Sequence, residues 1–154
     1  MVIREAGILF RGYTLINGTY HQTSGDHIDR DLRSGLLTAL LNFAETAFDK
    51  SLIEYIEGKK YVIAFTQDHL ISKDFGEEEM LVSYAILDKE KKIDKYVHRA
   101  VIPMLKEVLI QFKEKYKHIE LFSEISKFRD FKKNLDSIFG LDTKTIDERF
   151  KGFL

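Results

Sequence analysis

The sequence predicts an α/β protein of the α+β type, in which a five-stranded antiparallel sheet carries helices on both faces. Two strand pairs with short glycine-containing turns, one amphipathic segment between them and helical periodicity in the second half predict this fold. The expected element order is β-β-α-β-β-β-α-α. At 154 residues, with no internal repeat or linker-like stretch, the chain is expected to form one domain over residues 1–154.

The first strand pair is predicted over residues 2–10 and 13–21. Arg11-Gly12 separates the two strands, and glycine can take the positive φ that a tight reversal requires. Asn17-Gly18 is a competing turn signal, and a reversal there would extend the first strand to Ile16 and shift the register. We favour the reversal at Arg11-Gly12.

A long helix is predicted from Leu32 to about Phe48, with Asp29 or Asp31 as its N-terminal cap. Its apolar residues recur every three or four positions and form one stripe that faces a sheet. Gly35 lies inside this stripe and costs about 1 kcal/mol of helix propensity relative to alanine. A close approach of the helix backbone to the sheet would explain that glycine.

Three more strands are predicted after this helix. Residues 52–56 and 61–65 flank a glycine-containing turn at residues 57–60, which is typical of a second hairpin. A loop over residues 66–79 then leads to a strand over residues 80–87. Because this last strand is apolar on both faces, we expect it to be central in the sheet.

The second half is predicted to be helical. Apolar residues recur at helical spacing over residues 93–116, and Pro103 predicts a kink or restart at residues 101–103 because proline lacks a backbone donor. A third helix is predicted over residues 122–138, and it is expected to stop at Gly140.

The charges do not favour a general polyanion-binding protein. The chain has 24 basic and 25 acidic side chains and a net charge of -1, so only a local patch could attract nucleic acid or an anionic membrane. The run at residues 89–92 is interpreted as a charged loop. Phe128 and Phe131 are expected in the core, while Lys132 and Lys133 are expected on the solvated side of their helix.

The sequence contains few groups that suggest catalysis. The absence of cysteine excludes disulfides, thiolate zinc sites and cysteine nucleophiles. His21 and His27 are close in sequence to Asp26, Asp29 and Asp31, but their spacing matches no metal signature, and a polar loop with a helix cap explains them. Glycine-rich phosphate loops and a serine nucleophile elbow are also absent. We therefore expect no cofactor, no metal site and no enzymatic activity.

The element order, with the chain starting directly in the first strand, resembles the longin fold, a relative of the roadblock and profilin folds. The stretch Ser34-Gly35-Leu36-Leu37-Thr38-Ala39, at the centre of residues 32–44, is similar to the first helix of archaeal longin-like and roadblock-like proteins. The resemblance implies a non-enzymatic platform that binds small Ras-like GTPases, another longin or roadblock protein, a second copy of itself, or trafficking-type complexes.

No apolar run approaches the roughly 20 residues that span a bilayer, so the sequence predicts no integral membrane segment. We expect a cytoplasmic protein that reaches membranes through its partners. No interaction with nucleic acid is expected.

A longin-like strand order of 2-1-5-4-3 would leave residues 13–21 and 51–57 at the edges of the sheet. Edges are natural docking sites because their backbone groups are unpaired. Roadblock-type dimers use the corresponding third strand and first helix. The predicted partner-interface residues are Asn42, Glu45, Ile53 and Tyr55.

Two other functions stay open at this stage. A small-molecule sensor of PAS-like or profilin-like design would need a cavity between the sheet and the helices, whereas a docking platform needs a packed core and an available edge. An enzyme would have to use the polar loop between His21 and Asp31.

Overall fold

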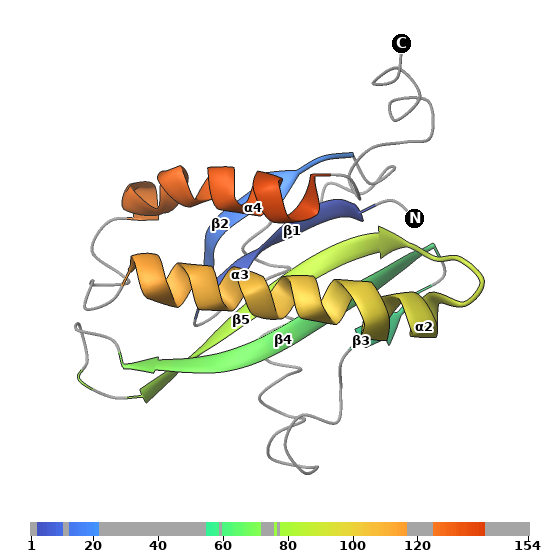
Figure 1. The fold of residues 1–154 in the computed structure, drawn as a ribbon, viewed down its shortest axis with the longest axis horizontal. Helices are drawn as coiled ribbons and strands as arrows, with labels where there is room; N and C mark the ends of the chain where they lie inside the picture. The colour runs from blue at the N-terminus through green and yellow to red at the C-terminus, as the bar shows by residue number, and fades with distance from the viewer. Residues whose placement is uncertain are drawn as a thin grey trace.

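The computed structural model describes residues 3–10, 13–21, 55–58, 60–71, 76, 78–116 and 125–140. Five strands within these residues form one antiparallel sheet in the order β2-β1-β5-β4-β3, which confirms the expected five-stranded antiparallel sheet (Figure 1). The strands are β1 (Ile3–Phe10), β2 (Tyr13–Thr19), β3 (Tyr55–Glu57), β4 (Tyr61–Ile71) and β5 (Glu78–Asp88).

The described helices follow β5 and lie on one face of the sheet (Figure 1). They are α2 (Ile93–Tyr96), the π-helical turn η1 (Val97–Val101), α3 (Ile102–Lys115), the 3₁₀ helix η2 (Ile125–Phe131) and α4 (Lys132–Phe139). The helix predicted over residues 32–48 lies outside the described residues, so the expectation of helices on both faces remains a prediction. No helix in the described ranges is long and apolar enough to cross a membrane.

The first hairpin reverses where the sequence predicted. Phe10 pairs with Tyr13, which leaves residues 11–12 between the strands, and Asn17 and Gly18 lie within β2. A bulge between Ile8 and Leu9 shifts the register of the pair. The competing reversal at Asn17-Gly18 is therefore wrong.

Strand β5 is central, as predicted, because β1 and β4 flank it. Its side chains alternate between the two faces. The face toward the helices includes Leu81 and Ala85, whereas Val82 and Tyr84 belong to a second buried cluster on the opposite face. Both sets are almost fully buried, which explains the continuous apolar run of this strand.

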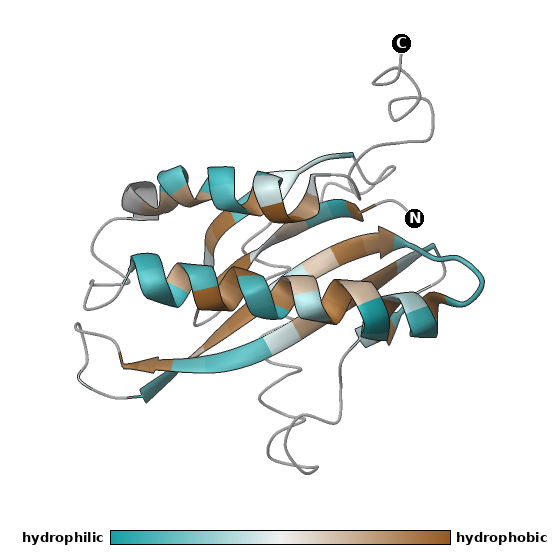
Figure 2. Ribbon diagram, in the orientation of Figure 1, coloured by the Kyte–Doolittle hydropathy of each residue, from teal (hydrophilic) through white to brown (hydrophobic). Residues whose placement is uncertain are grey.

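Aromatic rings fill the layer between the sheet and the helices. The ring centroid of Phe112 on α3 lies 4.8 Å from that of Tyr116, 5.4 Å from that of Phe128 and 5.3 Å from that of Phe131. Figure 2 shows the alternation of apolar and polar residues along α3 that places one side of this helix in the core.

Neither the kink nor the restart expected near Pro103 is seen, and the helix type changes there instead. The backbone N–H of Ile102 donates to the carbonyl of Val97, five residues earlier, at the end of the π-helical turn η1. Pro103 then occupies the first turn of α3, where its missing N–H is tolerated. The helix continues without a break in the chain direction (Figure 1).

The third predicted helix is wrong in its first half, which is the 3₁₀ helix η2. Phe128 and Phe131 are three residues apart, and a three-residue repeat places both rings on one side of a 3₁₀ helix, where both are fully buried. From Phe131 to Leu135 and Phe139 the spacing is four, which suits the α-helix α4. The helix ends before Gly140, whose backbone is right-handed.

The predicted loop over residues 66–79 is also wrong at both ends. Strand β4 continues to Ile71 and β5 begins at Glu78, so the two strands pair without interruption from Tyr61 to Ile71. The extension of β4 beyond Phe65 is not recognised from the sequence because it begins with polar side chains. The hydroxyl groups of Thr66 and Ser83 lie 2.7 Å apart across the two strands, and Ser83 also donates to the Leu105 carbonyl of α3 at 2.9 Å.

The face of the sheet opposite the helices contains a buried polar pair. The hydroxyl of Tyr84 on β5 donates to the carboxylate of Glu5 on β1. The Tyr84 ring lies over Gly7, where a Cβ would be 2.9 Å from the ring and 2.6 Å from the Ile16 carbonyl oxygen. Gly7 therefore provides the space that the tyrosine ring and the neighbouring strand occupy.

Candidate functional site

The candidate site is one edge of the sheet, where a short strand lies beside a long one. β3 has three residues, and they pair with Val62, Ile63 and Ala64 of the 11-residue β4. From Phe65 to Ile71 the outer side of β4 has no partner strand among the described residues. We call this segment the β4 open edge.

The backbone groups that face outward along this edge follow from the hydrogen bonds at the start of β4. The Tyr61 carbonyl accepts a bond from Gly58 of the outer hairpin at 2.8 Å, whereas the Lys60 carbonyl accepts from Lys89 beside β5 at 2.9 Å. The pairing of β4 with β5 has no register shift, so this alternation holds along β4. The outward groups of the β4 open edge therefore include those of Gln67, His69 and Ile71.

One of these outward groups is occupied by a neighbouring side chain. Asp68 accepts a hydrogen bond from the backbone N–H of His69 at 2.7 Å and another from the Lys113 ammonium of α3 at 3.1 Å. Burial alone would raise the pKa of Asp68, but these two hydrogen bonds and the nearby positive charges lower the pKa below its ordinary value of 3.8. Asp68 is thus held ionised and covers part of the edge.

The side chains along the edge are polar until its last residue. Figure 2 colours this half of β4 as hydrophilic, with an apolar tip. His69 is exposed, and Ile71 has 68% of its surface exposed, which is the largest value among the exposed apolar residues of the described ranges. Polar side chains on an edge limit uncontrolled strand pairing, and an exposed isoleucine offers an apolar contact to a partner.

A second cluster attaches β3 to the helix that follows β5. The Tyr55 hydroxyl donates to the Asp94 carboxylate at 2.9 Å, and Nδ1 of His98 lies 2.8 Å from the Asp94 carbonyl oxygen. Because a carbonyl only accepts, Nδ1 of His98 carries a proton. The Tyr55 and His98 rings meet edge to face, with centroids 6.2 Å apart. These contacts fix the short strand against α2 and η1.

The predicted site residues divide into two groups. Tyr55 is the first residue of β3 and is half-buried in the cluster just described. The other three predicted interface residues, Asn42, Glu45 and Ile53, lie outside the described residues. The structure therefore locates one of the four predicted residues.

Most of the polar loop considered for metal binding, including His27, lies outside the described residues. His21 follows β2, and its backbone N–H donates to the Arg4 carbonyl at 3.0 Å. Within the part of the chain that the structure describes, no three histidine, cysteine or acidic side chains are grouped so that they could hold a metal ion.

Sequence reasoning missed the β4 open edge because it ended β4 too early. The strand was predicted over residues 61–65, and Gln67, Asp68 and His69 favour a loop when read alone. One signal was available: Leu70 lies at an even position, like Val62 and Ala64, and packs against the same core cluster.

The five-stranded antiparallel sheet and the helices that pack on it define an α+β protein, and among the described residues β4 is paired on its outer side only at Val62, Ile63 and Ala64. No protein-family model and no curated protein matches this chain.

Proposed function

We propose that this protein is a non-enzymatic interaction module of longin-like design. It acts as a regulator or adaptor that binds a small Ras-like GTPase, or another longin or roadblock-type protein, through the edge formed by β3 and the β4 open edge. The observation that carries this proposal is the length difference between β3 and β4, which leaves outward backbone groups of β4 without a partner strand in the described residues.

Strand addition is the binding mode that suits this edge. A partner strand placed beside β4 would bond to the outward groups of Gln67, His69 and Ile71, and backbone bonds of this kind supply affinity. Ile71 would add an apolar contact at the end of the edge. The Asp68 carboxylate competes for the His69 N–H, so this module favours a partner that can displace or tolerate it.

The packing behind the sheet supports a platform over a small-molecule sensor. A sensor would use a cavity between the sheet and the helices. In this protein the rings of Phe112, Phe128 and Phe131 occupy that layer with centroid separations near 5 Å, and all three are fully buried. Close-packed rings favour a rigid layer that supports an edge.

The proposal is tested by calorimetric titration with purified small Ras-like GTPases from the same organism, each loaded with GDP or with a non-hydrolysable GTP analogue. The test variant is Ile71→Lys, which adds a positive charge at the edge. The matched control is Ile110→Lys on α3, where an isoleucine that is 58% exposed receives the same charge away from the edge.

We expect saturable binding of at least one GTPase or longin-type partner, weakened at least roughly tenfold by Ile71→Lys and unchanged by Ile110→Lys. Circular dichroism must show that both variants keep the wild-type fold. Equal binding by both variants would show that the edge is not the docking surface. If the wild-type protein and the Ile71→Lys variant both converted an added small molecule catalytically, the non-enzymatic function would be contradicted.

A further inference from the structure

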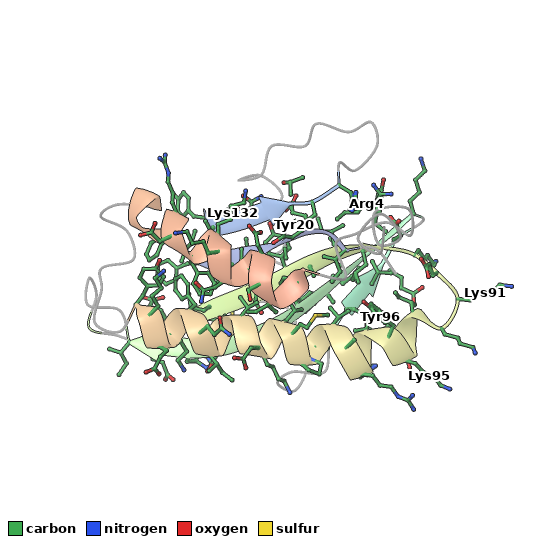
Figure 3. All side chains as sticks on the ribbon, turned by 45° about the horizontal axis from the view of Figure 1, so that its top comes forward. Arg4, Tyr20, Lys91, Lys95, Tyr96 and Lys132 are labelled. Atoms are coloured by element: carbon green, nitrogen blue, oxygen red, sulfur yellow. The ribbon has the colours of Figure 1, made fainter. Side chains whose placement is uncertain are left out.

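A cluster of basic side chains covers the end of the sheet where β4 begins and β5 ends. We call it the lysine end, and it consists of Lys60, Lys91, Lys92, Lys95 and Arg99, all of them exposed. The Lys60 carbonyl accepts a bond from the Lys89 N–H at 2.9 Å, which holds the two turns of this end together. Figure 3 shows Lys91 and Lys95 extending outward at this end, far from Lys132.

The acids in the described residues around this cluster do not neutralise it. Glu57 lies 3.4 Å from Lys89, and Asp88 pairs with Arg4, so both acids have their own cations. Glu90 and Asp94 remain as the acids interspersed with the five basic residues in this segment. None of the five takes part in an ion pair within the described ranges. The lysine end therefore has a local excess of positive charge, although the whole chain has a net charge of -1.

The position of Lys92 does not favour stability. Lys92 has a φ of 61°, in the left-handed region that glycine or asparagine occupies most readily. It precedes α2 without making a side-chain cap, and cations near the start of a helix oppose the helix dipole. Because three local preferences are broken at Lys92, folding does not explain the lysine at this position.

The composition of the lysine end indicates which kind of anion it meets. Protein interfaces are enriched in aromatic residues and arginine and depleted in lysine. Four of the five basic residues here are lysines, and none of the exposed large apolar residues lies within residues 89–99. Mobile ammonium groups suit a fluid layer of lipid phosphates, because that layer requires no fixed geometry.

We propose that the lysine end binds the surface of an anionic lipid bilayer. The β4 open edge lies toward the other end of an 11-residue strand, which is about 35 Å long by the usual rise per residue, so a bilayer at the lysine end leaves the β4 open edge accessible. The bilayer contact is independent of the proposed partner docking, since it uses different residues.

The test measures sedimentation with vesicles of phosphatidylcholine alone and of phosphatidylcholine mixed with phosphatidylglycerol, at low ionic strength. The test variant carries Lys91→Glu, Lys92→Glu and Lys95→Glu. The matched control carries Arg129→Glu, Lys132→Glu and Lys133→Glu, which changes the net charge equally on the exposed surface of η2 and α4. Thermal unfolding must show that both variants are folded.

We expect the wild-type protein to bind only the mixed vesicles and to lose this binding as salt is added. The lysine-end variant should lose at least roughly 100-fold in partition coefficient, because each basic residue near an anionic surface contributes about fivefold. The control should keep most of its binding. Absence of wild-type binding, or an equal loss in both variants, would overturn the proposal. Duplex DNA binding as tight as vesicle binding, and lost in the same variant, would assign the lysine end to nucleic acid.

Discussion

The two outer strands of the sheet are attached to the helices by the same kind of hydrogen bond, but they pair with different lengths of their neighbouring strands. At the β2 edge the Tyr20 hydroxyl donates to Asp136 of α4 at 2.8 Å, and at the β3 edge the Tyr55 hydroxyl donates to Asp94 of α2 at 2.9 Å. In both places a tyrosine near the end of an outer strand is hydrogen-bonded to an aspartate on a helix. Within the described residues, β2 pairs with β1 from Glu5 to Phe10, whereas β3 pairs with β4 only from Val62 to Ala64.

The different extent of pairing follows from the lengths of the described strands, because the two tyrosine–aspartate hydrogen bonds have nearly the same length. β2 has seven residues beside the eight of β1, whereas β3 has three beside the 11 of β4. A strand can cover only as many backbone groups as it has residues. The tyrosine contacts therefore fix where each outer strand lies, and the mismatch in length between β3 and β4 leaves the β4 open edge without a partner strand in the described part of the chain.

The largest effect is expected from proline substitutions at two consecutive residues of β4, whose backbone N–H groups face opposite sides of the strand. Thr66→Pro should destabilise the fold by about 3 kcal/mol, because the N–H of an even-numbered β4 residue faces β5 and proline removes that bond. Gln67→Pro, one residue later, removes an outward N–H and should cost less than about 1 kcal/mol. Urea unfolding of the two variants measures the contrast, and similar losses would show that Gln67 is paired on its outer side.

A smaller effect is expected at Gly7, which lies between both neighbours of β1. Gly7→Ala should destabilise by about 1–3 kcal/mol, because the new methyl group would lie 2.6 Å from the Ile16 backbone oxygen and would push against the Tyr84 ring. Gly58→Ala, where the nearest atom is 3.2 Å away, provides the comparison at the other edge. A larger loss at Gly58 than at Gly7 would contradict this packing.

The sequence predicts the parts of the fold that local pattern controls. The first reversal and the central position of β5 both follow from turn residues and apolar runs within a few positions. The β4 open edge does not follow from local pattern. Asp68 accepts a hydrogen bond from Lys113, which is 45 residues away in the sequence, and Tyr55 donates to Asp94, which is 39 residues away.

The hydrogen bond from Tyr20 to Asp136 at the β2 edge should respond to alkaline pH. Burial, and then the hydrogen bond to Asp136, raise the pKa of Tyr20 well above its ordinary value of 10.0. Above pH 10 the unfolded chain loses this proton while the folded protein keeps it, so stability falls as the pH rises. Tyr20→Phe should cost about 1 kcal/mol at neutral pH and weaken that alkaline dependence.

Asp136→Asn is the control for this titration. It removes the negative charge but leaves the phenol in place, so the alkaline dependence should be reduced without disappearing. Free energies of unfolding at neutral pH and above pH 10 compare the three proteins. Identical slopes in all three would show that Tyr20 is not buried against α4.

The smallest effect is expected at the open edge and at the acidic end of the pH scale. The pKa of Asp68 is lower in the folded protein than its ordinary 3.8, so the contribution of this group is complete above that value and is lost as the pH falls through the folded pKa. Its side chain is 42% exposed, and Asp68→Ala should therefore cost no more than about 0.5 kcal/mol at neutral pH. The difference from the wild type should vanish in acid.

Asp68→Ala also separates stability from docking, because removal of the carboxylate releases the His69 N–H to the outer side of β4. A partner strand could then bond to it without displacing a side chain. We therefore expect the variant to unfold more easily and yet to bind its partner at least as tightly as the wild type. Lys113→Ala provides the control, since it removes the ion pair but leaves the bond from His69 to Asp68 in place. If Asp68→Ala weakens partner binding, the carboxylate contacts the partner directly and does not protect the edge.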